Sequence, residues 1–378
     1  MTDRVAVVGG GVVGCAVARS LAADHDVVVM ERGQVAGEAS ALAAGLVTMT
    51  PSYSDVPAIP ELANGFFREY DGTGAFRYTE RASVEPVPPD REGEARRRAE
   101  RLAGDGVDVR FVDAATVAER HPRIDVSGYV GAVVFEETGW VDPYTFATTL
   151  RDDAVKRGAE FRTDTAVDGV SVEGGAVTGV GTDAGHVPAD AVVVAAGWRT
   201  PDLLAGVLEV PVRPYRTQCI VVDPDEDASE LPMGWLPDDH VYWRPEHNGD
   251  LLLGGWSFAE DDPEGASGDE DEAFRQHVAE LLPEVFHGTD GAAFVNGWAG
   301  VDGATPDTRP IVDAPDEAPD GLVLATGFHG RGVMTAPVAA RGVRALLAGE
   351  DAGFPLSTFA LDRFDSRSRD FEFVSISA

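Results

Sequence analysis

Lysine is nearly absent from this sequence, since Lys156 is the only one among 378 residues. Thirty basic residues stand against 65 acidic ones, for a formal net charge of −35. Such a charge repels itself in dilute buffer, whereas about 1 M salt shortens the Debye length to roughly 3 Å and screens the repulsion. The composition is therefore typical of a halophile's protein. Because the acids are spread along the whole chain, a single basic partner explains them less well, and nucleic-acid binding is disfavoured.

Cysteine and long apolar runs are also scarce. Cys15 and Cys219 are the only cysteines, too few for a disulfide framework or for a zinc or iron–sulfur ligand set. No uncharged apolar run is long enough to span a bilayer. The first apolar stretch belongs to the motif described next rather than to a signal peptide. We therefore expect a cytoplasmic protein without a metal site.

The first 31 residues carry the strongest signal in the chain. An apolar run, Val5–Val8, predicts a buried strand, and it breaks at a glycine-rich turn that contains Gly9 and Gly11. A segment with helical periodicity follows and includes Gly14. A second apolar run then ends at Glu31. This order of strand, glycines, helix, strand and acid is the dinucleotide-binding pattern.

Each part of this pattern has a physical task. Gly9 permits a tight turn, Gly11 lets the backbone approach a pyrophosphate, and Gly14 lets the helix pack closely on the strand. The free N–H groups and positive dipole end of the helix hold phosphates. Glu31 accepts hydrogen bonds from a ribose diol. The sequence therefore predicts that the protein binds a dinucleotide.

The rest of the chain divides by its periodicity. A glycine-containing segment at 167–182 predicts a β-hairpin, because its flanks alternate and no helix follows. Strands separated by acidic turns between 212 and 285 predict an antiparallel sheet, and from Phe294 onward we expect loops and one buried strand. We predict a mixed α/β fold. Its Rossmann-type domain comprises 1–85, 138–210 and 292–378, and an inserted antiparallel-sheet substrate domain comprises 86–137 and 211–291.

Five further segments follow the opening motif in a characteristic order. They are Ser40-ALAAG, Val141-DP, Ala189-DAVVVAAGW, Trp298-AGVDGATPDTRPIV and Ala325-TGFHGRGVMTAP. Together they resemble the superfamily of D-amino-acid oxidase, glycine oxidase and sarcosine oxidase over nearly the whole chain. The W-A-G-x-x-x-x-T-P-D form is most similar to the β-type sarcosine, dimethylglycine and proline dehydrogenases. The resemblance implies FAD, and the presence of one dinucleotide loop agrees with FAD rather than NAD.

Motif and resemblance together predict the residues that contact FAD. The N-terminus of the last helix is expected to point at the N1–C2=O edge of the flavin, where its positive dipole stabilises the anionic reduced form. The predicted cofactor contacts are Gly9, Gly11, Val12, Val13, Gly14, Glu31, Arg32, Ser40, Ala44, Gly45, Val167, Ala196, Gly197, Gly327, Gly330, Arg331, Gly332 and Val333.

The chain also departs from these relatives. Where glycine oxidase and D-amino-acid oxidase resemble one another in placing an arginine for the substrate carboxylate, this sequence has Asp302. The carboxylate lysine of monomeric sarcosine oxidase falls on Met334, which weakens the case for chemistry with oxygen. Leu42 and the segment 298–305 offer no histidine or cysteine for a covalent flavin bond. We therefore expect non-covalent FAD.

Four residues are candidates for the substrate site. Arg331 and Arg244 could bind a carboxylate, because arginine forms bidentate hydrogen bonds with this group. Arg331 could equally contact flavin or backbone, and Arg244 could form a salt bridge. Tyr242 could donate a hydrogen bond or form an apolar wall. His329 could act as a base or cap the helix.

The resemblance implies an FAD-dependent dehydrogenase or oxidase that acts on the C–N bond of a small amino acid or N-methylated amine. Hydride would pass to flavin N5, and the imine would hydrolyse in water. One alternative is a 2-hydroxy-acid or glycerol-phosphate dehydrogenase with His329 as the base. Another is a flavin-carrying subunit of a multi-subunit dehydrogenase. The substrate, the electron acceptor and the oligomeric state, homo- or hetero-oligomeric, stay open.

Overall fold

The strand that opens the chain lies inside a six-stranded sheet. In this computed structural model, which describes residues 3–375, α1 (Val12–Leu21) follows that strand directly. All neighbours in the sheet pair in parallel except β19 and β20. In spatial order the strands are β19 (Ile311–Asp313), β20 (Leu322–Thr326), β13 (Ala191–Val194), β1 (Arg4–Val8), β2 (Asp26–Met30) and β9 (Glu160–Arg162).

Both faces of this sheet are covered, which explains why its strands are apolar throughout. Val5 and Val7 face α1, α6 (Pro143–Lys156) and α9 (Gly332–Ala348). Ala6 and Val8 point to the opposite face, as the two-residue period of a strand requires. That face is covered by a three-stranded sheet of β10 (Val167–Glu173), β11 (Ala176–Thr182) and β12 (Gly185–Pro188). The hairpin predicted at 167–182 is confirmed.

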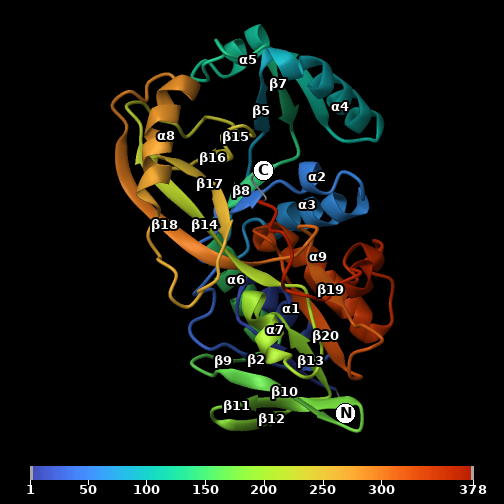
Figure 1. The fold of residues 1–378 in the computed structure, drawn as a ribbon. Coiled ribbons are helices and arrows are strands. Elements are labelled where there is room, and N and C mark those ends of the chain that lie inside the picture. The colour runs from blue at the N-terminus through green and yellow to red at the C-terminus, as the bar shows by residue number, and fades with distance from the viewer. Residues whose placement is uncertain (1–2, 376–378) are drawn as a thin grey trace.

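An eight-stranded sheet forms the other half of the molecule (Figure 1). All its neighbours pair antiparallel except β15 and β5. Its strands in spatial order are β18 (Ala293–Ala304), β14 (Arg213–Asp223), β17 (Leu251–Ala259), β16 (Val241–Pro245), β15 (Met233–Leu236), β5 (Ser83–Val87), β7 (Gly131–Phe135) and β6 (Val109–Asp113).

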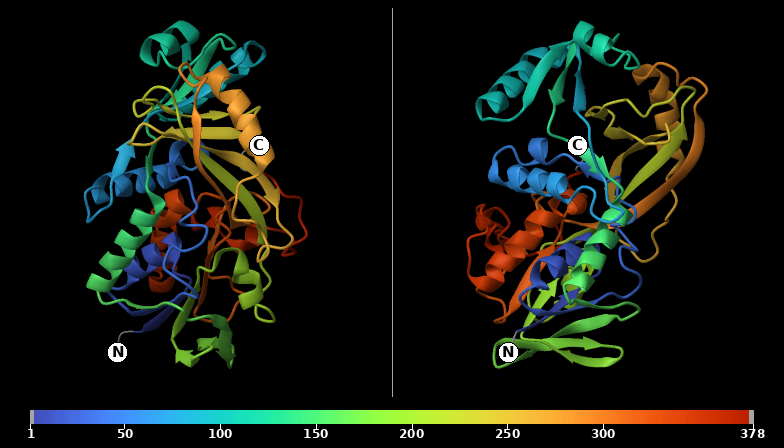
Figure 2. Two further views of the ribbon diagram at one scale, coloured as in Figure 1. Left: turned by 90° about the vertical axis from the view of Figure 1, so that its left-hand side faces the viewer. Right: turned by 180° about the vertical axis from the view of Figure 1, so that it is seen from behind.

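Helices cover the two ends of the eight-stranded sheet. The apolar side of α8 (Glu272–Val285) packs on β14, β16 and β17. At the other end of the sheet, α4 (Glu92–Gly104) packs on β5, β6 and β7 (Figures 1 and 2). A three-stranded sheet and further helices complete the fold. These are β3 (Leu46–Val47), β8 (Gly139–Val141), β4 (Tyr78–Glu80), α2 (Met49–Ser52), α3 (Ala58–Tyr70), α5 (Ala114–Arg120) and α7 (Thr200–Leu203). Among residues 3–375, no helix combines the length and apolar character needed to cross a bilayer.

The expectation of loops from Phe294 onward is wrong at its start, because β18 pairs with β14 along its whole length. The glycines that suggested a loop are needed because other segments pass close to this strand. A Cβ on Gly300 would lie 3.1 Å from the Cβ of Leu42, and one on Gly303 would lie 3.1 Å from the backbone nitrogen of Trp198. Residues 293–304, assigned from the sequence to the cofactor domain, therefore lie in the other sheet. The remaining domain boundaries stay a prediction.

The packing of α1 on β1 yields a test with an internal control. A Cβ on Gly14 would lie 1.9 Å from the carbonyl oxygen of Gly9, whereas one on Gly65 in α3 would meet no atom within 4 Å. We expect Gly14→Ala to lower the free energy of unfolding by about 1–3 kcal/mol or more. Gly65→Ala should raise it by about 0.5–1 kcal/mol, because alanine favours the helix. Denaturant unfolding in high salt measures both, and equal stability of the two variants would contradict the close contact.

Candidate active site

One large cavity runs between the six-stranded sheet and the eight-stranded sheet. Its volume is about 1990 Å³, well above the roughly 300–1,000 Å³ of an ordinary ligand pocket. From Glu31 and Val167 it passes the turn before α1 and the N-terminus of α9, reaches Tyr242 on β16, and extends beyond it to β5, β7, α4 and α8. The cavity is therefore long enough to take an extended ligand and a second, smaller molecule.

The glycine turn and Glu31 form a preorganised cradle at the first end of the cavity. The two carboxylate oxygens of Glu31 accept hydrogen bonds from the backbone N–H groups of Gly10, at 2.7 Å, and Gly33, at 2.8 Å. The hydroxyl of Ser40 accepts one from the N–H of Val12 at 2.9 Å. A Cβ on Gly11 would lie 3.0 Å from that hydroxyl. The backbone at the glycine turn thus carries no side chain where the dinucleotide pattern requires a phosphate to approach closely.

Most of the predicted cofactor contacts do line this cavity. Two do not, since Gly14 packs beneath the turn and Gly327 packs against Thr305. The residues that line it are Gly9, Gly11, Val12, Val13, Glu31, Arg32, Ser40, Ala44, Gly45, Val167, Ala196, Gly197, Gly330, Arg331, Gly332 and Val333. Their meeting at one surface supports the predicted contacts without itself testing them.

An ion-pair network near Glu31 was not foreseen from the sequence. Arg199 contacts Glu38 at 2.5 Å and Glu264 at 3.1 Å, and Arg32 reaches the same Glu264 at 3.2 Å. All four side chains line the cavity. From the sequence, Glu264 lies in one of the acidic turns between strands, and only the fold brings this turn to the first strand–helix unit. The network orders this turn at the cavity edge.

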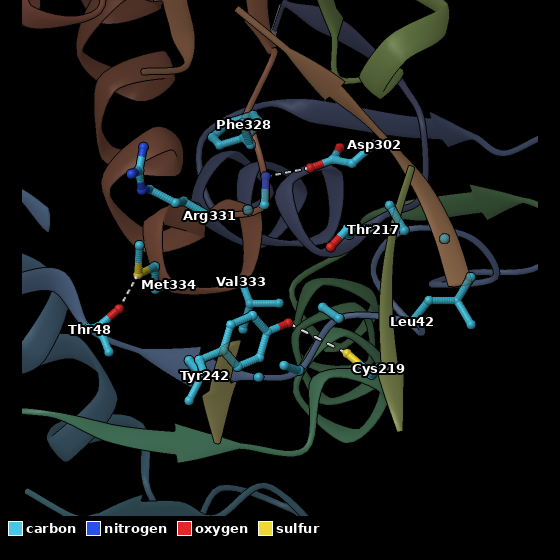
Figure 3. A pocket seen from close by; sticks show the side chains of 18 of the residues that line it. Leu42, Thr48, Thr217, Cys219, Tyr242, Asp302, Phe328, Arg331, Val333 and Met334 are labelled. Atoms are coloured by element: carbon cyan, nitrogen blue, oxygen red, sulfur yellow. Dashed lines mark hydrogen bonds between the residues drawn. The ribbon is translucent and has the colours of Figure 1, made fainter. Parts of the chain in front are cut away.

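The part of the cavity around Leu42, Thr48, Tyr242, Val333 and Met334, called the chamber from here on, is mainly apolar and contains a few polar groups (Figure 3). The hydroxyl of Tyr242 lies 3.5 Å from the sulfur of Cys219, and the hydroxyl of Thr48 lies 3.6 Å from the sulfur of Met334. A Cβ on Gly254 would lie 2.3 Å from the Tyr242 hydroxyl, so this glycine makes room for the ring. Burial raises the pKa of Tyr242 well above its usual value, so the phenol keeps its proton.

Arg331 stands between the two ends of the cavity. It is the residue that precedes α9, and it lines the cavity as predicted. One terminal nitrogen of its guanidinium donates to the carbonyl oxygen of Thr308, at 2.6 Å, and to the Thr308 hydroxyl, at 3.0 Å. These bonds orient the side chain along the start of the helix (Figure 3). A positive group and a helix N-terminus thus share one side of the chamber.

Arg244 lies beneath the cavity rather than in it. Its Nε donates to the carbonyl oxygen of Ala44 at 2.5 Å, and another guanidinium nitrogen pairs with Glu246 at 2.9 Å. The guanidinium carbon lies 4.4 Å from the ring centroid of Trp140. With its donors engaged in this way, Arg244 supports the Ala44–Gly45 backbone that lines the cavity. The structure therefore favours the salt-bridge alternative over a substrate contact.

His329 is fully buried behind the chamber and does not line it. Its Nε2 lies 2.9 Å from the carbonyl oxygen of Val374, and its Nδ1 accepts a hydrogen bond from the N–H of Thr305 at 3.3 Å. The ring stacks on Phe373. Burial, reinforced by the charge of Arg331, lowers the pKa of His329 to about 4. A neutral imidazole with both nitrogens engaged gives no support to a catalytic base.

A dinucleotide cradle joined to a chamber beneath an antiparallel sheet is the arrangement of a nucleotide-dependent enzyme. The family of FAD dependent oxidoreductases named DAO matches residues 4–346, and the chain belongs to it. The predicted family and the need for FAD are thereby confirmed. The residues fit this cofactor, because the glycine backbone at the α1 N-terminus would hold its phosphates and the Glu31 carboxylate beside the turn would hold its ribose.

Individual relatives support the same assignment. The chain is 29% identical to glycine oxidase of Pseudomonas putida over 364 residues, which cover 93% of this chain and 96% of that one. It is 26% identical to 4-methylaminobutanoate oxidase (formaldehyde-forming) of Paenarthrobacter nicotinovorans, with 98% of this chain matched to 47% of that one. The crystal structure of L-proline dehydrogenase from P. horikoshii has the same fold, with a TM-score of 0.87, 23% identity, and coverage of 96% and 98% of the two chains.

The buried His329 predicts a dependence of stability on pH. Unfolded histidine binds a proton near pH 6.5, whereas His329 in the folded protein binds one only near pH 4. Between these values the unfolded chain holds more protons, so stability falls as the pH decreases. We expect the free energy of unfolding of wild type to exceed that of His329→Asn by about 2 kcal/mol less at about pH 5 than at neutral pH. Asparagine tolerates the positive φ of 51° here. Denaturant unfolding measures this difference in free energy, and a difference that does not change with pH would contradict the buried neutral ring.

Proposed function

We propose that this FAD-dependent oxidoreductase oxidises the C–N bond of a small amino acid or N-methylated amine. The relatives act, by their names, on glycine, 4-methylaminobutanoate and L-proline, which are all small amino acids. The single observation that carries the proposal is the mainly apolar chamber that continues the cofactor cradle. Its walls include Leu42, Tyr242, Val333 and Met334, so a small organic substrate can be held out of bulk water.

When bound, FAD supplies the acceptor for the hydrogen and two electrons removed from the substrate. The protein's own contribution is to bind and to orient. Glu31 and the glycine turn hold the adenosine and phosphate end, and Arg244 holds the backbone at Ala44 in place. The N-terminus of α9 stabilises negative charge that develops near it. Most of the rate acceleration then comes from positioning FAD and the substrate beside each other in one cavity.

Arg331 is the group we assign to a substrate carboxylate. It lines the chamber and carries a fixed charge, and only one of its terminal nitrogens is bound to Thr308. Arginine recognises carboxylates through two parallel hydrogen bonds. Tyr242, which keeps its proton, is placed to donate a further hydrogen bond or to pack against the substrate. His329 has no part in this proposal, which removes the base that oxidation of a 2-hydroxy acid would need.

Anaerobic bleaching of the visible flavin band in the purified holoenzyme tests the proposed activity. The panel contains glycine, sarcosine, dimethylglycine, L- and D-proline, D-alanine and 2-hydroxy acids. We expect bleaching by an amine or amino acid, with the colour restored by air at a rate that separates an oxidase from a dehydrogenase. Bleaching by hydroxy acids alone would overturn the proposal. Bound flavin that no member of the panel bleaches would favour a flavin-carrying subunit. FAD released by acid precipitation would support non-covalent binding.

We also propose that the protein works in the cytoplasm of a halophile, because its net charge of −35 needs screening. Raising KCl from about 0.1 M to about 1 M shortens the Debye length from roughly 10 Å to roughly 3 Å. We expect the thermal midpoint to rise by several degrees over this range. Sucrose at equal osmolality is the control, since it leaves charge unscreened. A midpoint that falls with KCl would show that the Arg–carboxylate pairs outweigh the repulsion, against the proposal.

A further inference from the structure

Asp302 is a carboxylate that faces the chamber from the eight-stranded sheet. It lies on β18 opposite Tyr215 of β14, and it is half-buried, with its side chain on the cavity wall. One carboxylate oxygen accepts a hydrogen bond from the N–H of Gly330 at 2.8 Å (Figure 3). The N–H of Gly303 also hydrogen-bonds to it. The strand and the loop before α9 therefore hold this carboxylate in one position.

Several acids on the cavity wall have arginine partners, whereas Asp302 has none among the described residues. Glu85 binds Arg98 through both of its oxygens, at 2.8 and 2.9 Å, and Glu38 pairs with Arg199. Within residues 3–375, no arginine, lysine or histidine nitrogen lies within 4.0 Å of the Asp302 carboxylate. A charge that is surrounded by protein and lacks an ion-pair partner is costly unless a ligand completes its environment.

The groups around Asp302 leave its carboxylate free to accept further hydrogen bonds. Burial raises the pKa of its carboxyl, and the N–H groups of Gly330 and Gly303 oppose this shift by donating to the carboxylate. Tyr215 across the strand pair stays protonated, because burial raises its pKa well above the usual value. Arg331, on the other side, directs one guanidinium nitrogen to Thr308. In the part of the chain that the structure describes, no cation with N–H donors contacts the Asp302 carboxylate.

We propose that Asp302 binds the cationic amino group of the substrate and thereby determines which substrates the chamber accepts. This inference rests on the proposed function and assigns an orientation within it. The amino group lies toward β18, and a carboxylate, where the substrate has one, lies toward Arg331. An anion placed against β18 is rejected, because it would meet a like charge in a site with little water. Substrates therefore bind as ammonium ions, and the nitrogen releases one proton to solvent before the hydride leaves carbon, because only the neutral amine has the lone pair that forms the imine.

The test uses three molecules of one shape that differ in charge: tert-butylammonium, tert-butanol and pivalate. None has hydrogen on the carbon that bears its polar group, so none can be oxidised there. Binding to the full-length holoenzyme at neutral pH and constant high KCl is followed by the perturbation of the flavin spectrum. The variant is Asp302→Asn, whose amide oxygen can still accept from Gly330. The control is Asp316→Asn, the same change at an exposed acid away from the cavity.

We expect wild type and Asp316→Asn to bind tert-butylammonium more tightly than either of the other two. Asp302→Asn should lose about tenfold or more in affinity for the cation, the range of a charge-assisted hydrogen bond, with little change for tert-butanol. Pivalate should bind better to the variant than to wild type. Equal affinity of wild type and Asp302→Asn for tert-butylammonium would overturn the proposal, as would binding of no cation at all.

The two proposals can fail separately. If no amine bleaches the flavin but the charge preference is present and lost in Asp302→Asn, the substrate class is wrong and the cation site stands. If amines bleach the flavin at the same KM in wild type and Asp302→Asn, the activity stands and the assignment of Asp302 fails. FAD content and the denaturant midpoint, measured on each variant, show that neither result comes from a misfolded chain.

Discussion

The contact between α1 and the turn that precedes it is the constraint on which the rest of the structure depends. Gly14 passes so close to the carbonyl oxygen of Gly9 that no side chain fits between them. This closeness sets the start of α1 against the end of β1, and the Glu31 carboxylate then binds the N–H of Gly10. A phosphate site needs N–H groups fixed in space before the ligand arrives, because ordering them on binding would cost affinity.

The second half of the molecule reaches this cradle through another set of close contacts. Gly300 and Gly303 on β18 let Leu42 and the backbone at Trp198 lie against the strand. The indole nitrogen of Trp298 donates to the carbonyl oxygen of Leu42 at 2.8 Å. The same strand carries Asp302 to the chamber. The antiparallel sheet thus supplies both a wall of the cavity and a charged group in its chamber, which is the arrangement that the proposed function needs in order to place a substrate beside FAD.

More of the predicted cofactor residues than of the predicted substrate residues lie on the cavity wall. The cofactor motif is local, since strand, turn and helix follow one another, and their spacing alone brings Gly9, Gly11 and Glu31 together. His329 was a candidate because it lies in the glycine-rich segment before the last helix, and Arg244 because the resemblance implies that the sheet domain faces the flavin there. Whether a side chain at such a position enters the cavity depends on the local backbone. His329 sits at a positive φ and turns toward the C-terminal segment, and Arg244 turns toward Ala44.

The sequence by itself determined the α/β class, the strand–turn–helix unit at the start of the chain, the hairpin at 167–182 and the family, because these depend on short spacings and on the order of motifs. Only the tertiary structure decided that residues 293–304 form a strand, that Glu264 joins the network around Arg199, and that Asp302 faces the chamber without a cation. These features depend on pairing between segments far apart in the chain. Such pairing is settled by which surfaces pack together, and no local periodicity records it.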